Sequence, residues 1–227
     1  MGKQIFISGG GGGIGQALCR RLVAAGDHPI IGYRTLSPSL TAFCDELSIP
    51  RVTLNFDQEN AATTAIEALD ALECHLDGIV FAASPPPVIG PFGAITEIDM
   101  LTQWRANVLG PQAFLGQVLK RDFRKRKSGF ALAILTKALA DEETPGMGQM
   151  GAYVIAKSGL MGVLSAAKAE FPWLKIGSIR PGLTETPMLD AFDARYLDAM
   201  REKDPRSRFS ASDEVAADLF ALIGDVK

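Results

Sequence analysis

The sequence predicts a single α/β domain over residues 1–227, with a doubly wound parallel sheet and helices on both faces. Short apolar runs that suit buried strands alternate with segments of helical spacing along the chain. The chain has 227 residues, of which 47% are hydrophobic, and this is enough for one such domain and its core. Right-handed crossovers would bring the loops that follow the strands to one ligand crevice.

A glycine loop at residues 8–15 joins the first apolar run, residues 5–7, to a helix with regularly spaced apolar residues. Bare glycines let phosphate oxygens approach the backbone, and a helix start supplies unpaired N–H groups. The loop therefore predicts a dinucleotide pyrophosphate site. A flexible linker is the alternative, but a linker does not join a buried strand to an amphipathic helix. A mononucleotide P-loop would need a Gly-Lys-Ser/Thr sequence that is not found here.

The amino-terminal half continues the alternation. Residues 29–33 predict a second strand, and residues 38–47 have helical spacing. Residues 51–55 predict a third strand, and the alanine-rich stretch 59–72 predicts a helix on propensity. The continuous apolar run at 78–82 is typical of a strand buried on both faces of a parallel sheet.

The carboxyl-terminal half continues the alternation after a proline-rich loop. Helical spacing predicts a helix at 98–123, an apolar run predicts a buried strand at 130–135, and residues 136–150 predict a mobile loop. A helix at 151–171 and a strand at 176–179 are expected next. The chain then continues with a charged helical segment at 188–203 and a helix through residue 222 that Asp213 caps. Every candidate loop below follows a strand.

Composition argues against several classes of protein. A net charge of −3 and a pI of about 5.5 do not suit a nucleic-acid surface, and we interpret the basic run 120–127 as a solvated helix end. Cys19, Cys44 and Cys74 are far apart and suggest neither a disulfide framework nor a metal site. No signal peptide or bilayer-length apolar run is recognised. We therefore expect a cytoplasmic protein without a metal, a membrane anchor or nucleic acid.

Tyr153 and Lys157 are four residues apart on a predicted helix, so they project from one face. A free tyrosine is a poor acid or base at neutral pH, and a neighbouring ammonium is expected to lower its pKa. The pair therefore makes hydride chemistry on a carbonyl plausible, and the lysine could also donate to a ribose hydroxyl. A chance pair on a surface helix is the alternative.

Together with the glycine loop, this pair resembles the short-chain dehydrogenase/reductase family, in its single-domain form, over nearly the whole chain. The Thr-Gly-x-x-x-Gly-Ile-Gly stretch of that family is matched by Ser8, Gly9, Gly13, Ile14 and Gly15. The resemblance implies an NAD(P)-binding Rossmann fold and hydride transfer between a nicotinamide and a carbonyl or secondary alcohol. It implies that Tyr153 transfers the proton. It also implies that Lys157 tunes the pKa of that phenol and binds the ribose.

Three further stretches match the family. Asp57 stands at its adenine-binding aspartate, and a helix N-cap is the alternative. Asn107, followed by Val-Leu-Gly, matches the helix asparagine that keeps a water in the proton relay; a polar residue that satisfies helix backbone is the alternative. Pro181, Gly182 and Thr186 match the stretch that closes over the nicotinamide, although a strand-ending turn would also carry the Pro-Gly pair.

Two stretches depart from the family. The position of its active serine holds Thr136, whose hydroxyl could polarise a substrate carbonyl while its methyl crowds the pocket. Lys137 puts an unexpected charge beside this position. Where the family has Asn-Asn-Ala-Gly, the chain has residues 81–84, so Ala83 alone is retained beside the cofactor.

Cofactor choice depends on the end of the second predicted strand, where members that use NAD carry an acidic residue. Here Tyr33 is followed by Arg34. A guanidinium suits a 2′-phosphate, and no carboxylate is placed to repel it. We predict NADP over NAD, and a solvated arginine is the alternative.

The main prediction is therefore an NADP-dependent oxidoreductase acting on a carbonyl or alcohol. A dinucleotide-binding sensor or scaffold that has lost turnover is a second hypothesis, because the family serine and the Asn-Asn-Ala-Gly stretch are altered. A sugar-nucleotide epimerase is weaker, because few residues follow Thr186.

Substrate-pocket walls are expected from the proline-rich loop after Ser84 and from residues 137–150 and 188–209. Apolar candidates there, which could instead be simple packing, are Phe92, Met147, Met150, Met188, Leu189 and Phe192. The family's usual final strand does not follow the closing helix. We therefore expect a homodimer built on the two long helices, with a tetramer as the alternative.

Overall fold

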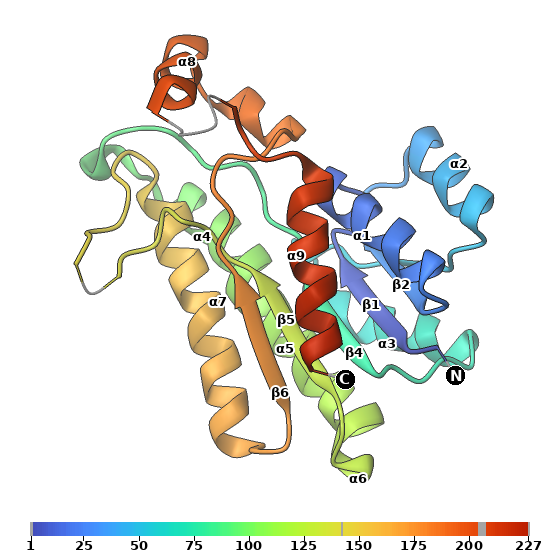
Figure 1. The fold of residues 1–227 in the computed structure, drawn as a ribbon. Coiled ribbons are helices and arrows are strands. Elements are labelled where there is room, and N and C mark those ends of the chain that lie inside the picture. The colour runs from blue at the N-terminus through green and yellow to red at the C-terminus, as the bar shows by residue number, and fades with distance from the viewer. Residues whose placement is uncertain (1, 142, 204–207, 227) are drawn as a thin grey trace.

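The computed structural model describes residues 2–141, 143–203 and 208–226 (Figure 1). One sheet of parallel strands has the order β3-β2-β1-β4-β5-β6. Its members are β1 (Gln4–Ser8), β2 (His28–Tyr33), β3 (Arg51–Thr53), β4 (Gly78–Phe81), β5 (Phe130–Ile134) and β6 (Lys175–Ile179). The order reverses between β1 and β4, and a crevice opens at the carboxyl ends of the strands at such a point.

Strand β1 shows why the sequence forms this core. It pairs with β2 on one side and β4 on the other, so that Ser8 stands opposite both Gly32 and Phe81. Successive side chains point to opposite faces of a sheet. Phe6 accordingly enters the core on one face, whereas Ile5 and Ile7 enter the core on the other face.

Helices cover both faces of the sheet, as predicted. The face that holds Phe6 is covered by α3 (Ala61–Ala71), α5 (Gly110–Val118) and α7 (Gly151–Glu170). The opposite face is covered by α1 (Gly13–Ala24), α2 (Pro38–Leu47) and α9 (Ser212–Asp225). The rings of Phe6 and Phe114 lie 4.7 Å apart and join the sheet to α5. The predicted doubly wound α/β fold is therefore confirmed.

The helix predicted at 98–123 has the expected extent but not a uniform geometry. It runs through α4 (Glu97–Trp104), α5 and α6 (Arg124–Arg126), with π-helical segments η2 (Arg105–Leu109) and η3 (Leu119–Phe123) between them. A π-helical turn changes the direction in which the following side chains point, and such turns are frequent at functional sites. Asn107 lies in the first of them.

Two local predictions were wrong. The third strand ends at Thr53 and not at residue 55. The segment 188–203 is helical as predicted, but it divides into a 3₁₀ turn, Pro187–Ala191, and α8 (Ala194–Lys203). Asp213 does not cap the last helix, which begins one residue earlier; the Glu214 carboxylate instead accepts the N–H of Ala211 at 2.8 Å. Asp213 pairs with Arg21 of α1 at 2.5 Å, a tertiary partner that local sequence does not show.

Two further findings concern the surface and the thiols. No helix within the described ranges combines the length and apolarity that crossing a membrane requires. All three cysteines are free, and Cys19 and Cys44 lie in the core. Burial raises the pKa of the Cys19 thiol, so this group stays protonated and serves as packing.

Candidate active site

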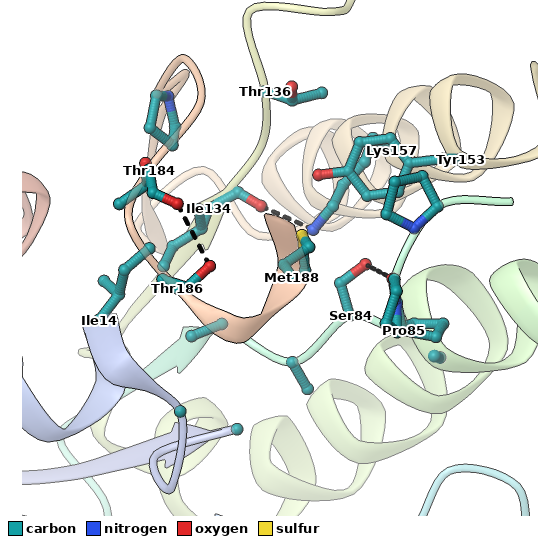
Figure 2. A pocket seen from close by; sticks show the side chains of 18 of the residues that line it. Ile14, Ser84, Pro85, Ile134, Thr136, Tyr153, Lys157, Thr184, Thr186 and Met188 are labelled. Carbon is teal, nitrogen blue, oxygen red and sulfur yellow. Dashed lines mark hydrogen bonds between the residues drawn. The ribbon is translucent and has the colours of Figure 1, made fainter. Parts of the chain in front are cut away.

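A cavity of about 550 Å³ opens at the carboxyl ends of the strands. Its walls come from the glycine loop, from the segments after β2 to β6, from α4 and from α7 (Figure 2). Nearly all of the predicted site residues meet there, namely Gly9, Gly13, Ile14, Gly15, Arg34, Asp57, Ala83, Thr136, Tyr153, Lys157, Pro181, Gly182 and Thr186. Ser8 and Asn107 are buried behind this wall.

The glycine loop is built for close approach of backbone. Gly9 has a φ of 71°, and a Cβ added there would lie 2.7 Å from the backbone of Ala83. At Gly15 an added Cβ would lie 2.6 Å from the Cα of Gly10. Gly12 precedes the first turn of α1, whose N–H groups have no acceptor within the helix. A pyrophosphate suits this wall, because Gly9, Gly12, Gly13 and Gly15 line the cavity and carry no side chains of their own.

Ser8 supports the loop from behind. Its side chain is buried, and its Oγ accepts the N–H of Ala83 at 3.5 Å. The residue therefore connects the ends of β1 and β4 and does not face the cavity.

Tyr153 and Lys157 project from α7 toward the end of β5 (Figure 2). The Lys157 Nζ donates to the carbonyl oxygen of Ile134 at 2.9 Å and lies 5.7 Å from the centre of the Tyr153 ring. Only 8% of Tyr153 and 2% of Lys157 are exposed. Proton transfer is therefore possible within a largely dry part of the cavity.

Burial controls the protonation of this pair. It raises the pKa of Tyr153 to about 12, and a side-chain hydrogen bond with Thr136 opposes that rise. Burial also lowers the pKa of Lys157 from 10.5 to about 7. The pKa of Tyr153 is therefore raised and not lowered as expected, because burial penalises the charged phenolate. The Thr136 Oγ1 accepts the N–H of Ala138 at 3.1 Å, and the residue lines the same cavity as Tyr153.

Asn107 lies behind the wall in a buried amide network. Its Nδ2 donates to the Ser84 Oγ at 3.2 Å and to the Gln103 Oε1 at 3.2 Å. The Gln103 Nε2 donates to the carbonyl of Pro86 at 2.8 Å, which ties α4 to the proline-rich loop. Among the described atoms the Asn107 Oδ1 has no hydrogen-bond partner, although it is buried. Such an acceptor suits an ordered water.

Two residues that were predicted to bind different parts of the cofactor, Arg34 and Asp57, lie together at the cavity wall. Arg34 follows β2 and Asp57 follows β3, and their charged groups lie 4.0 Å apart. Both side chains are exposed, so this weak pair leaves the guanidinium free to turn. Asp57 is not the cap of α3, because that helix begins after Asn60.

The loop after β6 forms the opposite wall. The Thr184 Oγ1 donates to the carbonyl of Gly182 at 3.1 Å, and the Thr186 Oγ1 donates to that of Thr184 at 3.4 Å. Thr184 also pairs with Ser210 in an isolated bridge, which anchors both ends of the segment that follows. Pro181, Gly182 and Thr186 are thus held at the cavity.

The apolar part of the cavity was predicted with one error. Met147, Met150, Met188, Leu189 and Phe192 line it as expected. Phe92 does not, and is 76% exposed. Sequence reasoning missed the walls given by Asn55, Phe56, Thr102 and Thr184. The position of Asn55 and Phe56 just after the third strand was the available signal, since carboxyl ends of parallel strands meet at one edge.

Comparison with known proteins agrees with this geometry. A family model described as short chain dehydrogenase matches residues 3–196. The chain is 27% identical over 232 residues to the 3-oxoacyl-[acyl-carrier-protein] reductase of Aggregatibacter actinomycetemcomitans, covering 99% of this chain and 93% of that protein.

Two solved structures share the fold. The crystal structure of levodione reductase has a TM-score of 0.84 at 22% identity and covers 95% of this chain and 88% of that one. The 3-ketoacyl-(acyl-carrier-protein) reductase of Brucella melitensis, complexed with NADH, has a TM-score of 0.83 at 20% identity and covers 97% of this chain and 90% of that one.

Proposed function

Since the chain belongs to the short-chain dehydrogenase/reductase family and is an NAD(P)-dependent oxidoreductase, we propose that it moves a hydride between NADP and a carbonyl or secondary alcohol, with Tyr153 as the proton donor or acceptor. The observation that carries this proposal is a single one. The glycine loop and the Tyr153–Lys157 pair line the same cavity.

The residues that would hold the cofactor follow the cavity wall. Gly9, Gly13 and Gly15 offer bare backbone to a pyrophosphate, Ile14 adds a backbone N–H at the start of α1, and Ala83 has a small side chain beside it. The residues assigned to the adenine and nicotinamide ends are Asp57, Pro181, Gly182 and Thr186. When bound, the nicotinamide supplies or takes up the hydride.

The chain's own groups handle the proton and the substrate oxygen. With a pKa of about 12, Tyr153 is protonated at neutral pH and can donate to a carbonyl oxygen during reduction. The Thr136 hydroxyl would hold the same oxygen. Lys157 can carry or release a proton near neutral pH, and Asn107, with its unpaired Oδ1, would hold a water in the relay.

Support for NADP over NAD comes from the end of β2. Arg34 is exposed beside the cavity, and residues 33–35 contain no carboxylate. A 2′-phosphate would replace the weak, 4.0 Å interaction with Asp57 by a charge-assisted contact. The Brucella neighbour binds NADH, so the choice needs its own test.

Calorimetric titration with NADPH and NADH is that test, followed by absorbance assays with a carbonyl panel that includes levodione and an oxoacyl thioester. The proposal would be supported if NADPH binds more tightly than NADH and is oxidised in the presence of any carbonyl of the panel. Tight binding without turnover would favour the sensor or scaffold. Failure to bind either dinucleotide would refute the pyrophosphate assignment.

We also propose a homodimer in the cytoplasm that needs no membrane or nucleic-acid partner. The two long helical regions carry exposed apolar side chains, of which Ile98, Leu109 and Met161 are 76%, 51% and 42% exposed. Burying such a patch against a second copy would remove apolar area from water. Size-exclusion chromatography with light scattering distinguishes monomer, dimer and tetramer by their mass.

A further inference from the structure

Lys137 lies at the cavity beside the proposed reaction centre. It directly follows Thr136, and its own backbone N–H donates to the carbonyl of Pro181 at 2.9 Å. A Cβ added at Gly182 would be 3.7 Å from the Lys137 Cδ. The aliphatic stem of the lysine therefore lies against the Pro181–Gly182 turn, on the wall that faces the substrate side.

The ammonium of Lys137 differs from the other charges that line the cavity. Arg34 faces Asp57, and Lys157 donates to the Ile134 carbonyl. Lys137 is exposed, and within the described ranges it has neither a hydrogen bond nor an ion pair from its side chain. Asp141, four residues further along the chain, uses its carboxylate locally, because its Oδ1 accepts the N–H groups of Glu143 and Thr144.

Much of the cavity that Lys137 lines is apolar. This apolar lining includes Ala138, Met147, Met150, Met188, Leu189 and Phe192. Among the described lining residues Asp57 is the sole acid, and it lies at the adenosine end with Arg34. A neutral ligand filling this region would remove water from the ammonium without replacing it, whereas a ligand anion would form a charge-assisted hydrogen bond.

We propose that Lys137 binds a carboxylate on the substrate, and that the preferred substrates are oxo acids whose apolar chain separates the reacting carbonyl from that carboxylate. The inference rests on the proposed function and gives its substrate class. Thr136 and Tyr153 hold the carbonyl oxygen, the methionine-rich wall accepts the chain, and Lys137 fixes the other end.

The test compares matched pairs of substrates with NADPH: levulinate and longer oxo acids, each against its methyl ester. Wild-type protein should favour at least one acid over its ester, and Lys137→Met should lower that ratio of kcat/KM about tenfold. Lys137→Arg should keep most of the preference, because it keeps the charge. Lys120→Met, a change of an exposed lysine in η3, is the matched control and should leave the ratio unaltered. Added salt should shrink the preference in the wild type but not in Lys137→Met.

Two results would overturn the inference while leaving the proposed function intact. One is an acid-to-ester ratio that Lys137→Met does not change. The other is a rise in the KM for NADPH that is equal for acids and esters, which would assign Lys137 to the cofactor phosphates. Absence of turnover with every ketone would instead count against the proposed function.

A binding measurement tests the role of Lys137 independently of turnover. Hexanoate, an unreactive carboxylate, is titrated into the wild type and into Lys137→Met by NMR, each saturated with NADPH. About tenfold weaker binding to the variant would support the inference even without turnover, and equal affinities would overturn it.

Discussion

Replacing Lys157 by methionine should make the folded protein more stable while abolishing turnover. The side chain is 2% exposed, and burial lowers its pKa from 10.5 to about 7. At about 1.4 kcal/mol for each tenfold change, this difference corresponds to a cost of about 4 kcal/mol for holding the ammonium in the fold at neutral pH. Lys157→Met also removes the hydrogen bond to the Ile134 carbonyl, and this loss destabilises the folded protein by about 1–3 kcal/mol. A net stabilisation of about 1–3 kcal/mol remains.

The sign of the pH dependence gives a sharper check. The folded pKa lies below the unfolded one, so between pH 7 and 10.5 the unfolded chain binds more protons at this residue. The penalty is therefore complete below about pH 7 and fades as the pH rises toward 10.5. The advantage of Lys157→Met over the wild type should shrink in the same direction.

Urea denaturation at about pH 7 and about pH 9 measures both effects. Lys125→Met, at an exposed position of α6, controls for the loss of a lysine as such. A methionine variant that is less stable than the wild type at neutral pH, or whose advantage does not change with pH, would refute the assignment of Lys157 as a buried, weakly basic ammonium.

Four further predictions concern catalysis, cofactor choice and the glycine loop. Tyr153→Phe should lower kcat by about a hundredfold or more while NADPH still binds, and turnover near the wild-type rate would show that another group moves the proton. Thr136→Ala should cost less, because water can replace one hydroxyl; a loss as large as that of Tyr153→Phe would give the two residues equal roles. Arg34→Ala should weaken NADPH about tenfold while hardly changing NADH in calorimetric titrations, and equal losses would contradict the 2′-phosphate contact. Gly9→Ala should destabilise the fold by about 1–3 kcal/mol and weaken both dinucleotides, because its φ is 71° and Ala83 is 2.7 Å from the new Cβ. Gly116→Ala, with nothing within 4 Å, should be neutral or stabilising, and similar effects at both glycines would contradict this account.

Local chemistry made much of the fold predictable. The predicted helix 38–47 has the bounds of α2, because Pro38 suits a first helical turn and Ser37 accepts the N–H of Leu40. The apolar run at 78–82 and the glycine loop are likewise local signals. These signals predict the strands and helices of a doubly wound sheet, whereas the order of the strands depends on long-range pairing.

What the sequence did not predict depends on contacts between distant segments. Phe92 is as hydrophobic as the residues that line the cavity, and only the path of its loop leaves it exposed. Asp213 has a capping side chain, but Arg21 binds it from another helix. Arg34 and Asp57 were assigned to different parts of the cofactor, and their proximity follows from the pairing of β2 with β3.

The same distinction bears on whether the protein turns over a substrate or only binds a dinucleotide. The spacing of Tyr153 and Lys157 is a local feature, but the burial that gives them pKa values of about 12 and about 7 comes from β5 and from the segments packed over α7. A lysine that only bound a ribose hydroxyl could remain hydrated at much lower cost. A buried lysine that can gain or release a proton near neutral pH, beside a phenol that stays protonated, suits proton transfer. The burial of this pair therefore favours the oxidoreductase over the sensor. A Lys157→Met variant with altered stability but unchanged turnover and pH profile would contradict this assignment.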